Sequence, residues 1–306
     1  MNQYIRPAFL KKGDTVAVVS MASNPPESAR EESWLRDIEA WGVKVRKGKH
    51  IYDSIPGDFA GTDEDRASDI EAALLDPEVK AIISWRGGYG SMRTVTHLDT
   101  SLFVKHPKWI VGFSDITVFH TLFGKLGLES ILGDMPCSFY EGPDSPASIE
   151  YLRAALFGEL KSYSIAPHPY NRFGKARGRV VGGNLSLWNS TIGTPWENRL
   201  EEDCILFLED VEERMLSVDR MLLTLKCGGW LDRARAVIIG QFTDTAGEDK
   251  WNRDVYSLVR EYTDTLDVPV LFGFPCGHEH PNMSLYLGRE AEIEVSAEGG
   301  ILNYDI

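Results

Sequence analysis

The chain has 306 residues, of which 43% are hydrophobic and 25% are charged, an ordinary composition for one or two globular domains. Its 46 acidic residues outnumber 32 basic ones and give a formal charge of -14, which repels a phosphate backbone and excludes nucleic acid as an expected partner. No segment approaches the roughly 20 apolar residues that span a bilayer, and the N-terminus lacks the order of a secretory signal. We therefore expect a cytoplasmic protein that makes no membrane contact.

The first half of the chain alternates between strand and helix patterns. Short apolar runs typical of buried strands lie at 14–20, 43–48, 79–85 and 108–113. Helical patterns lie at 28–42, at 62–76 with Thr62 as N-cap, from Ser91 and from Asp115. Such repeated βα units predict a parallel sheet covered on both faces, of the Rossmann or flavodoxin-like kind, with ligands beyond the carboxyl ends of the strands. The acidic residues 63–69 are expected to form a solvated helix face.

The pattern changes after a helix at 142–158 and a connector rich in Pro, Gly and basic residues at 164–178. Strand-like runs follow at 178–186, 204–211, 235–242, 268–274 and 290–304. Helical runs interrupt them at 213–229 and 252–265. This order predicts a mostly β, barrel-like α+β domain. We expect an N-terminal α/β domain at 1–145, a connecting helix and linker at 146–175, and the C-terminal domain at 176–306.

Ser114 lies at the tight join between a strand and a helix, in the run GFSD. A serine at such a join exposes its hydroxyl at the carboxyl end of the sheet, and the N–H of Asp115 lies at a helix N-terminus, where an oxyanion is stabilised. The run is not the G-x-S-x-G of the α/β-hydrolases. The residues therefore allow a nucleophile or a plain N-cap serine.

A second glycine cluster, SWRGGYGSMR at 84–93, also joins a strand to a helix. Glycines let the backbone approach a bound group closely, so this loop could donate an N–H to an oxyanion or hold an anion, or it could be a turn without a ligand. Its spacing fits neither a dinucleotide fingerprint nor a phosphate-binding GK[ST] loop. Arg86 and Arg93 favour an anionic ligand such as a carboxylate.

A nucleophilic serine needs a base and an orienting carboxylate. His278 and His280 follow the strand at 268–274, and either could be the base, bind a metal as a His-x-His pair, or be structural. No cysteine or carboxylate cluster of matching spacing accompanies them, which argues against a metal. Glu209 and Asp210 end the strand at 204–211, where a carboxylate could orient His278 or simply cap the next turn.

Five motifs together are specific: RGGYGSMR, GFSDIT, VVGGNLS, LFLEDVEERMLSVDRML and GFPCGHEHPN, in this order. In this arrangement, from about residue 12 to about residue 295, the chain closely resembles the LD-carboxypeptidase family. This serine peptidase family includes muramoyl-tetrapeptide carboxypeptidases and microcin C immunity peptidases. The resemblance implies an α/β domain that carries the serine, a mostly β domain that carries the other catalytic groups, and an active site between them.

The resemblance also implies the site residues. They are a triad of Ser114, Glu209 and His278, with an oxyanion hole formed by the N–H groups of Gly88 and Asp115. The implied reaction needs no metal and no organic cofactor, the implied partner is a small peptide substrate, and members of the family are commonly homodimers. The leading hypothesis is removal of the terminal D-alanine from murein tetrapeptides.

The chain departs from many relatives in one run, since Leu132–Met135 reads LGDM where they carry HGPM. The immunity peptidases often carry an inserted loop with tryptophans that grip a nucleobase, and no such insertion is evident, although Trp188 and Trp196 lie nearby. Two alternatives remain open. One is an amidase that cleaves peptidyl-nucleotide antibiotics with the same triad, and the other is a catalytically silent binding protein.

Overall fold

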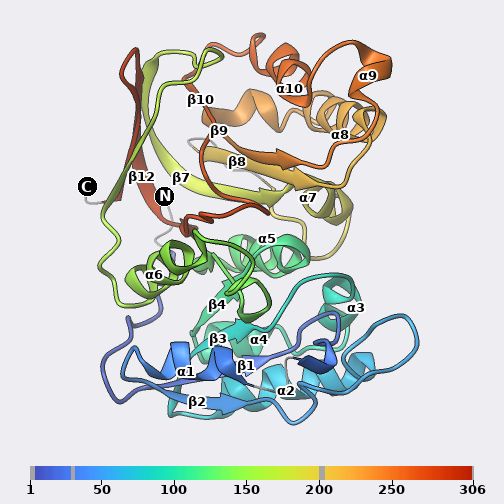
Figure 1. Cartoon of the computed structure of the whole chain (residues 1–306), viewed down its shortest axis with the longest axis vertical. Coiled ribbons are helices and arrows are strands. Elements are labelled where there is room, and N and C mark those ends of the chain that lie inside the picture. Colours follow the sequence, from blue (N-terminus) through green and yellow to red (C-terminus); the bar gives the residue numbers. More distant parts are fainter. Residues whose placement is uncertain (1–3, 29–31, 200–203, 305–306) are drawn as a thin grey trace.

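The computed structural model describes residues 4–28, 32–199 and 204–304, and it shows two sheets one above the other along the long axis (Figure 1). The first sheet has the strand order β11-β5-β4-β3-β1-β2. Its strands are β1 (Thr15–Val19), β2 (Lys44–Lys47), β3 (Val79–Ser84), β4 (Trp109–Gly112), β5 (Ser130–Leu132) and β11 (Leu285–Leu287). All pairs from β2 to β5 are parallel, which confirms the predicted parallel sheet, whereas β11 pairs antiparallel with β5.

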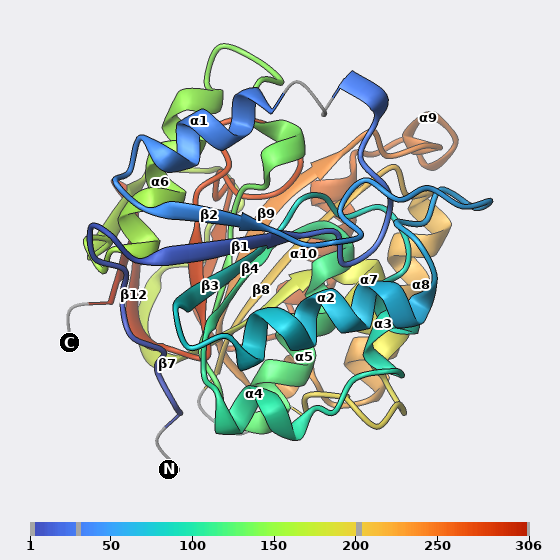
Figure 2. The ribbon, with the colours of Figure 1, turned by 90° about the horizontal axis from the view of Figure 1, so that it is seen from below.

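Helices cover both faces of this sheet. They are α1 (Ser33–Glu39), α2 (Asp63–Leu75), α3 (Ser91–Val95), α4 (Ser101–Lys105), α5 (Thr117–Leu126) and α6 (Ser145–Leu156). Figure 2 shows α1 and α6 on one side of the strands and α2 and α4 on the other. The predicted first helix began at 28, but residues 29–31 lie outside the described part of the chain. Within that part, no helix has both the length and the apolar character needed to cross a bilayer.

The N-terminus of α2 behaves only partly as predicted. Thr62 is its N-cap, because the Thr62 side chain accepts a hydrogen bond from Asp65 N at 3.1 Å while the Asp65 carboxylate accepts from Thr62 N at 3.0 Å. The expectation of a solvated acidic face over 63–69 is wrong for two members. Asp63 pairs with Arg66, and Asp69 is buried, where it accepts hydrogen bonds from the N–H groups of residues 49 and 50.

The second sheet has the order β10-β9-β8-β7-β12-β13-β6. Its strands are β6 (Ser162–Ile165), β7 (Gly174–Asn184), β8 (Cys204–Val211), β9 (Ala234–Thr243), β10 (Val270–Phe272), β12 (Glu290–Ser296) and β13 (Gly299–Asn303). The pairs from β10 to β7 are parallel and those from β7 to β6 antiparallel. A bridge between Arg172 and Val270 brings the chain that follows β6 against β10, so the sheet curls in the barrel-like manner predicted.

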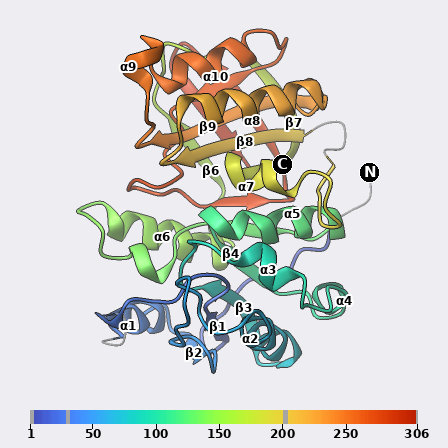
Figure 3. The same ribbon diagram turned by 90° about the vertical axis from the view of Figure 1, so that its right-hand side faces the viewer.

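The helices of this half are α7 (Leu185–Thr191), α8 (Met215–Cys227), α9 (Glu248–Trp251) and α10 (Val255–Thr263). In Figure 3, α8 and α10 lie together over the outer face of the sheet, and α5, α6 and α7 lie between the two halves of the molecule. The two-part α/β architecture with mixed sheets agrees with the predicted fold class.

One apolar core joins the two sheets. Side chains alternate along a strand, so Leu206 and Leu208 of β8 face the helices α8 and α10, while Ile205 and Phe207 point the other way. Ile205 and Phe207 belong to the same buried cluster as Trp109 of β4 in the first sheet. The halves are therefore held together by buried apolar surface rather than by a flexible hinge.

A buried ion pair crosses this core. Arg289, between β11 and β12, donates to Glu129 Oε2 through Nη2 at 2.6 Å and through Nε at 2.9 Å. Its guanidinium lies 3.4 Å from the centre of the Tyr286 ring, and Arg6 also donates to Glu129 at 3.0 Å. The pair ties the segment before β5 to the segment that leaves β11. Removal of one partner would leave the other charge buried and underpaired.

We expect Arg289→Met to lower the free energy of unfolding by about 3 kcal/mol, because Glu129 would lose its buried cation. Chemical denaturation followed by tryptophan fluorescence measures the change. Lys175→Met is the matched control, since Lys175 pairs with Glu294 on an exposed surface and should change stability by less than about 1 kcal/mol. Equal effects of the two substitutions would contradict the assigned role of the buried pair.

Candidate active site

Ser114 lies on a strained turn. Strand β4 ends at Gly112, a 3-10 helix begins at Ser114, and α5 begins at Thr117. Ser114 has φ 60°, a left-handed conformation that is uncommon outside glycine and that clusters at functional sites. Phe113, not Ser114, precedes the 3-10 helix, so the N-cap alternative does not hold. The turn presents a half-buried hydroxyl at the carboxyl end of β4, as predicted.

The glycine-rich loop after β3 lies directly against this turn. A Cβ on Gly87 would lie 3.1 Å from Ser114 Cβ and 3.3 Å from both Ser114 Oγ and Asp115 N, so any larger residue would crowd the serine turn. Gly88, the residue expected in the oxyanion hole, has φ 92° and lines the same cavity as Ser114. Sequence reasoning missed Gly87, although the Gly-Gly pair was a signal for it.

His278 is bonded to a carboxylate. Its Nδ1 donates to Glu209 Oε2 at 2.9 Å, and Glu209 has 0% of its side chain exposed. Gly277 permits this approach, because a Cβ there would lie 3.0 Å from Glu209 Oε2. The His278 ring meets the Phe113 ring edge-on at 5.0 Å, which places the histidine beside the residue that precedes Ser114. Ser114, from the turn after β4, and His278, from the loop after β10, therefore line the same cavity, and His278 is bonded to Glu209 of β8.

The other two candidates have different partners. His280 also lines the cavity, and its Nδ1 is bonded to Ser148 Oγ of α6 at 2.8 Å. Asp210 accepts hydrogen bonds from Asn184 Nδ2 at 2.9 Å and from Ser186 N at 3.0 Å, so it anchors the start of α7. The structure thus gives Glu209 and Asp210 different hydrogen-bond partners, and it does the same for His278 and His280.

Charges in the cavity set the protonation of these groups. Burial lowers the pKa of His278, but the negative charges of Glu209, Asp210 and Glu212 outweigh burial and raise it above its usual value. Burial, assisted by the charge of Glu209, raises the pKa of Asp210 to about 7. The His278 imidazole therefore accepts a proton readily beside Glu209, and a general base must be able to accept one.

The cavity measures about 530 Å³ and opens where the two halves meet. Besides the catalytic candidates, its lining includes Arg86, Glu141, Asn184, Glu212, Glu279 and Asn282. Of these six residues, only Arg86 was singled out from the sequence. Asn184 was missed, although its position at the end of a predicted strand, in the run GGN, could have indicated that it lines the site. Trp188 lies buried in the core under α8 and is not part of the lining.

The run that departs from relatives lies beside the cavity. Met135 lines it, while Asp134 is fully buried and accepts hydrogen bonds from Met135 N and from Ser138 Oγ. Burial raises the pKa of Asp134 to about 6. Asp134 therefore holds the loop that follows β5 in place instead of facing the ligand space directly.

One cluster in the described part of the chain has metal-like spacing. Ligand atoms of His50, Asp53 and Asp65 lie within 4.8 Å of one another. None of them lines the cavity, and Asp65 already serves as the capping residue of α2. This cluster has no part in the chemistry of the cavity.

Comparisons with known proteins agree with this arrangement. Residues 16–133 match the LD-carboxypeptidase N-terminal domain, and residues 177–293 match the LD-carboxypeptidase C-terminal domain. The chain is 33% identical to the probable murein peptide carboxypeptidase of Bacillus subtilis, over 97% of this chain and 94% of that protein.

Two solved structures are also similar. One is the muramoyltetrapeptide carboxypeptidase from Oxalobacter formigenes, with TM-score 0.85, 28% identity and coverage of 94% of this chain and 97% of that chain. The other is the microcin C7 self-immunity protein MccF in complex with aspartyl sulfamoyl adenosine, with TM-score 0.85, 25% identity and 98% of each chain covered. The resemblance read from five sequence motifs is confirmed: the chain belongs to the LD-carboxypeptidase family and is a serine-type carboxypeptidase.

Proposed function

We propose that the protein hydrolyses the amide bond between the L-centre of the diamino acid and the terminal D-alanine of murein tetrapeptides, with Ser114, Glu209 and His278 as its triad. The observation that carries the proposal is the His278–Glu209 hydrogen bond at the wall of the cavity that Ser114 lines. A role in cell-wall recycling in the cytoplasm, and assembly as a homodimer, belong to the same proposal and rest on the family resemblance.

The proposal gives each group a role. Glu209 accepts a hydrogen bond from Nδ1–H of His278, which leaves Nε2 free to accept the proton of Ser114 Oγ as that oxygen attacks the carbonyl carbon. The N–H groups of Gly88 and Asp115 stabilise the tetrahedral oxyanion. His278 then returns the proton to the leaving amine of D-alanine, and a water molecule activated by His278 hydrolyses the acyl-enzyme.

The charge of the cavity favours a diamino acid over an acidic acyl group. Glu141, Glu212 and Glu279 line the cavity and are exposed, and Arg86 is the one lysine or arginine among the lining residues. An ammonium group on the substrate side chain, as in lysine or diaminopimelate, would be attracted to these carboxylates, although diaminopimelate also carries a side-chain carboxylate, whereas the side-chain carboxylate of an aspartyl group, as in the ligand of the MccF structure, would be repelled. The second candidate function, cleavage of peptidyl-nucleotides, is favoured by the likeness to MccF and disfavoured by this charge.

We expect the purified protein to release D-alanine from L-Ala-D-Glu-meso-diaminopimelate-D-Ala and the Ser114→Ala variant to release none above background, because the nucleophile is lost. A coupled D-amino-acid oxidase assay measures the release. An aspartyl sulfamoyl adenosine substrate is tested in parallel. If the protein cleaved that compound but not the tetrapeptide, the proposed function would be cleavage of peptidyl-nucleotides instead of murein tetrapeptides.

We expect the rate to fall at low pH, because His278 must be neutral to act as the base, and the midpoint of this fall should lie above the usual pKa of histidine. Glu209→Gln removes a charge that raises the pKa of His278, while burial, which lowers it, remains. The midpoint should therefore move to lower pH, and the plateau rate should fall about 100-fold or more. A pH profile of kcat/KM for both proteins measures this, and an unmoved midpoint would remove His278 from the role of base.

We expect the double substitution Glu212→Gln and Glu279→Gln to lower kcat/KM about 5-fold for a tetrapeptide with lysine before the D-alanine, since two carboxylates near the ammonium group are lost. With norleucine in place of lysine, the change should stay within about 2-fold, because that side chain is uncharged. Glu298→Gln, an exposed carboxylate outside the cavity lining, is the control. Equal losses for lysine and norleucine would show that the cavity does not select by charge.

A further inference from the structure

The side chain of Asp115 links two segments that both border the nucleophile. Asp115 follows Ser114 in the 3-10 helix, and only 2% of it is exposed. Its Oδ2 accepts a hydrogen bond at 2.8 Å from Ser91 N, at the start of α3. Ser91 directly follows the glycine-rich loop 86–90. Asp115 therefore belongs to the serine turn through its main chain and holds the end of the loop through its carboxylate.

The two segments come from different βα units. The loop joins β3 to α3, and the serine turn joins β4 to α5, so neither unit alone fixes the distance between them. Gly87 approaches Asp115 N so closely that a Cβ on Gly87 would lie 3.3 Å from it. Gly88 is the next residue. Small shifts of α3 would therefore move the Gly88 N–H relative to the Asp115 N–H.

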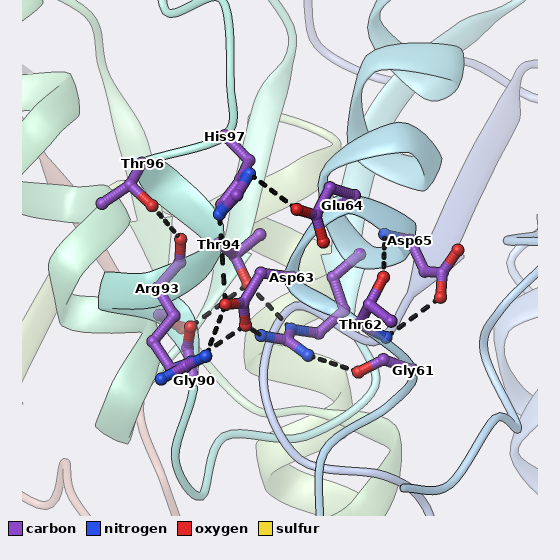
Figure 4. A network of polar contacts seen from close by, with 12 residues as sticks. Gly61, Thr62, Asp63, Glu64, Asp65, Gly90, Arg93, Thr94, Thr96 and His97 are labelled. Carbon is purple, nitrogen blue, oxygen red and sulfur yellow. Dashed lines mark hydrogen bonds and ion pairs between the residues drawn. The ribbon is translucent and has the colours of Figure 1, made fainter.

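Other hydrogen bonds of the loop and α3 join them to segments other than the serine turn. Ser23 Oγ accepts from Tyr89 N at 3.0 Å. Figure 4 shows the network around Asp63, in which Arg93 donates to Asp63 at 3.0 Å and the Arg66 guanidinium donates to Thr94 Oγ1 at 2.8 Å. These contacts anchor α3 to α2, but they do not reach Ser114. Among these hydrogen bonds, the bond from Ser91 N to the Asp115 carboxylate is the one that joins α3 to the serine turn.

Burial of the Asp115 carboxylate costs free energy, because the charged group loses its hydration. Burial raises the pKa of Asp115, which means that the charged form is disfavoured there. No ion pair with Asp115 is found among the described residues, and the burial is partly offset by hydrogen bonds from Ser91 and Gly90 and by the positive charge of Arg66. An apolar side chain would fill the space without this cost, but it would not accept a hydrogen bond from Ser91.

We propose that Asp115 is a positioning residue whose side chain sets the separation of the two oxyanion donors, its own N–H and that of Gly88. The inference rests on the proposed function, which assigns those two groups to the oxyanion hole. Such donors act only when they lie about 2.7–3.1 Å from the developing oxyanion, and a displacement of about 1 Å can cost about 100-fold in rate.

The test compares Asp115→Ala, which removes the acceptor, with Asp115→Asn, whose side-chain carbonyl keeps it. For Asp115→Ala we expect kcat to fall about 30-fold with KM within about 3-fold, and the affinity for phenylboronic acid, which forms a tetrahedral adduct with the serine, to fall in parallel. Asp115→Asn should stay within about 5-fold of the unsubstituted protein in both measurements, since its carbonyl oxygen still accepts from Ser91 N.

Asp69→Ala is the matched control. Asp69 is a buried carboxylate of the same domain that accepts two main-chain hydrogen bonds away from the loop and the serine turn. Its loss should lower the thermal midpoint without changing boronate affinity. If Asp115→Ala does not fold, Asp115→Ser, which is too short to reach Ser91 N, takes its place against Asp115→Asn.

The proposal would be overturned if the boronate affinity of Asp115→Ala stayed within about 2-fold of that of the unsubstituted protein. It would also be overturned if Asp115→Ala lost no more boronate affinity than Asp69→Ala, since a displaced oxyanion donor should lower the affinity far more. Because the adduct needs only Ser114 and the oxyanion donors, the boronate measurement holds even if the protein releases no D-alanine. A boronate that fails to bind the unsubstituted protein, or binds Ser114→Ala equally well, would count against Ser114 and the oxyanion hole themselves.

Discussion

The inward-facing side chains of β8 and β9 share one apolar core with those of β3 and β4, and the active cavity depends on this shared core. Ser114 and the glycine-rich loop follow β4 and β3 of the first sheet, whereas Glu209 lies near the end of β8 of the second sheet and His278 follows β10. Neither sheet carries a complete set of catalytic groups. The buried contact between them holds these groups around one cavity, and the proposed proton transfer and oxyanion binding depend on that arrangement.

Alternation along β8 explains how two adjacent carboxylates acquire different tasks. Glu209 points toward His278, whereas Asp210 lines the cavity and points toward Asn184 and the first turn of α7. Burial and the charge of Glu209 raise the pKa of Asp210 to about 7, so Asp210 is partly protonated near neutral pH. Glu209 is thus available to orient the imidazole of His278, while Asp210 holds the start of α7.

Much of this architecture could be predicted because its signals are local. Val-rich runs marked β1, β3 and β4, and the Gly-Phe-Ser join marked the turn that the structure shows at Ser114. The partner of each carboxylate and histidine could not be read from the chain, because Glu209 and Asp210 are equivalent until the register of β8 is known. Gly87 was missed for the same reason, since its approach to Ser114 is a contact between two separate βα units. The catalytic roles, the domain limits, the cytoplasmic location and the homodimer stay predictions.

Strand β11 has a consequence for how the chain can be made and divided. The first sheet is built from residues 15–132, but its edge beyond β5 is filled by Leu285–Leu287, near the other end of the sequence. During synthesis the hydrogen-bonding edge of β5 therefore stays open until almost the whole chain has left the ribosome. An N-terminal fragment that ends in the linker would carry that open edge permanently, and such edges pair readily with other chains. The two halves thus match two separate domain families in sequence, but the first half depends on the second to complete its sheet.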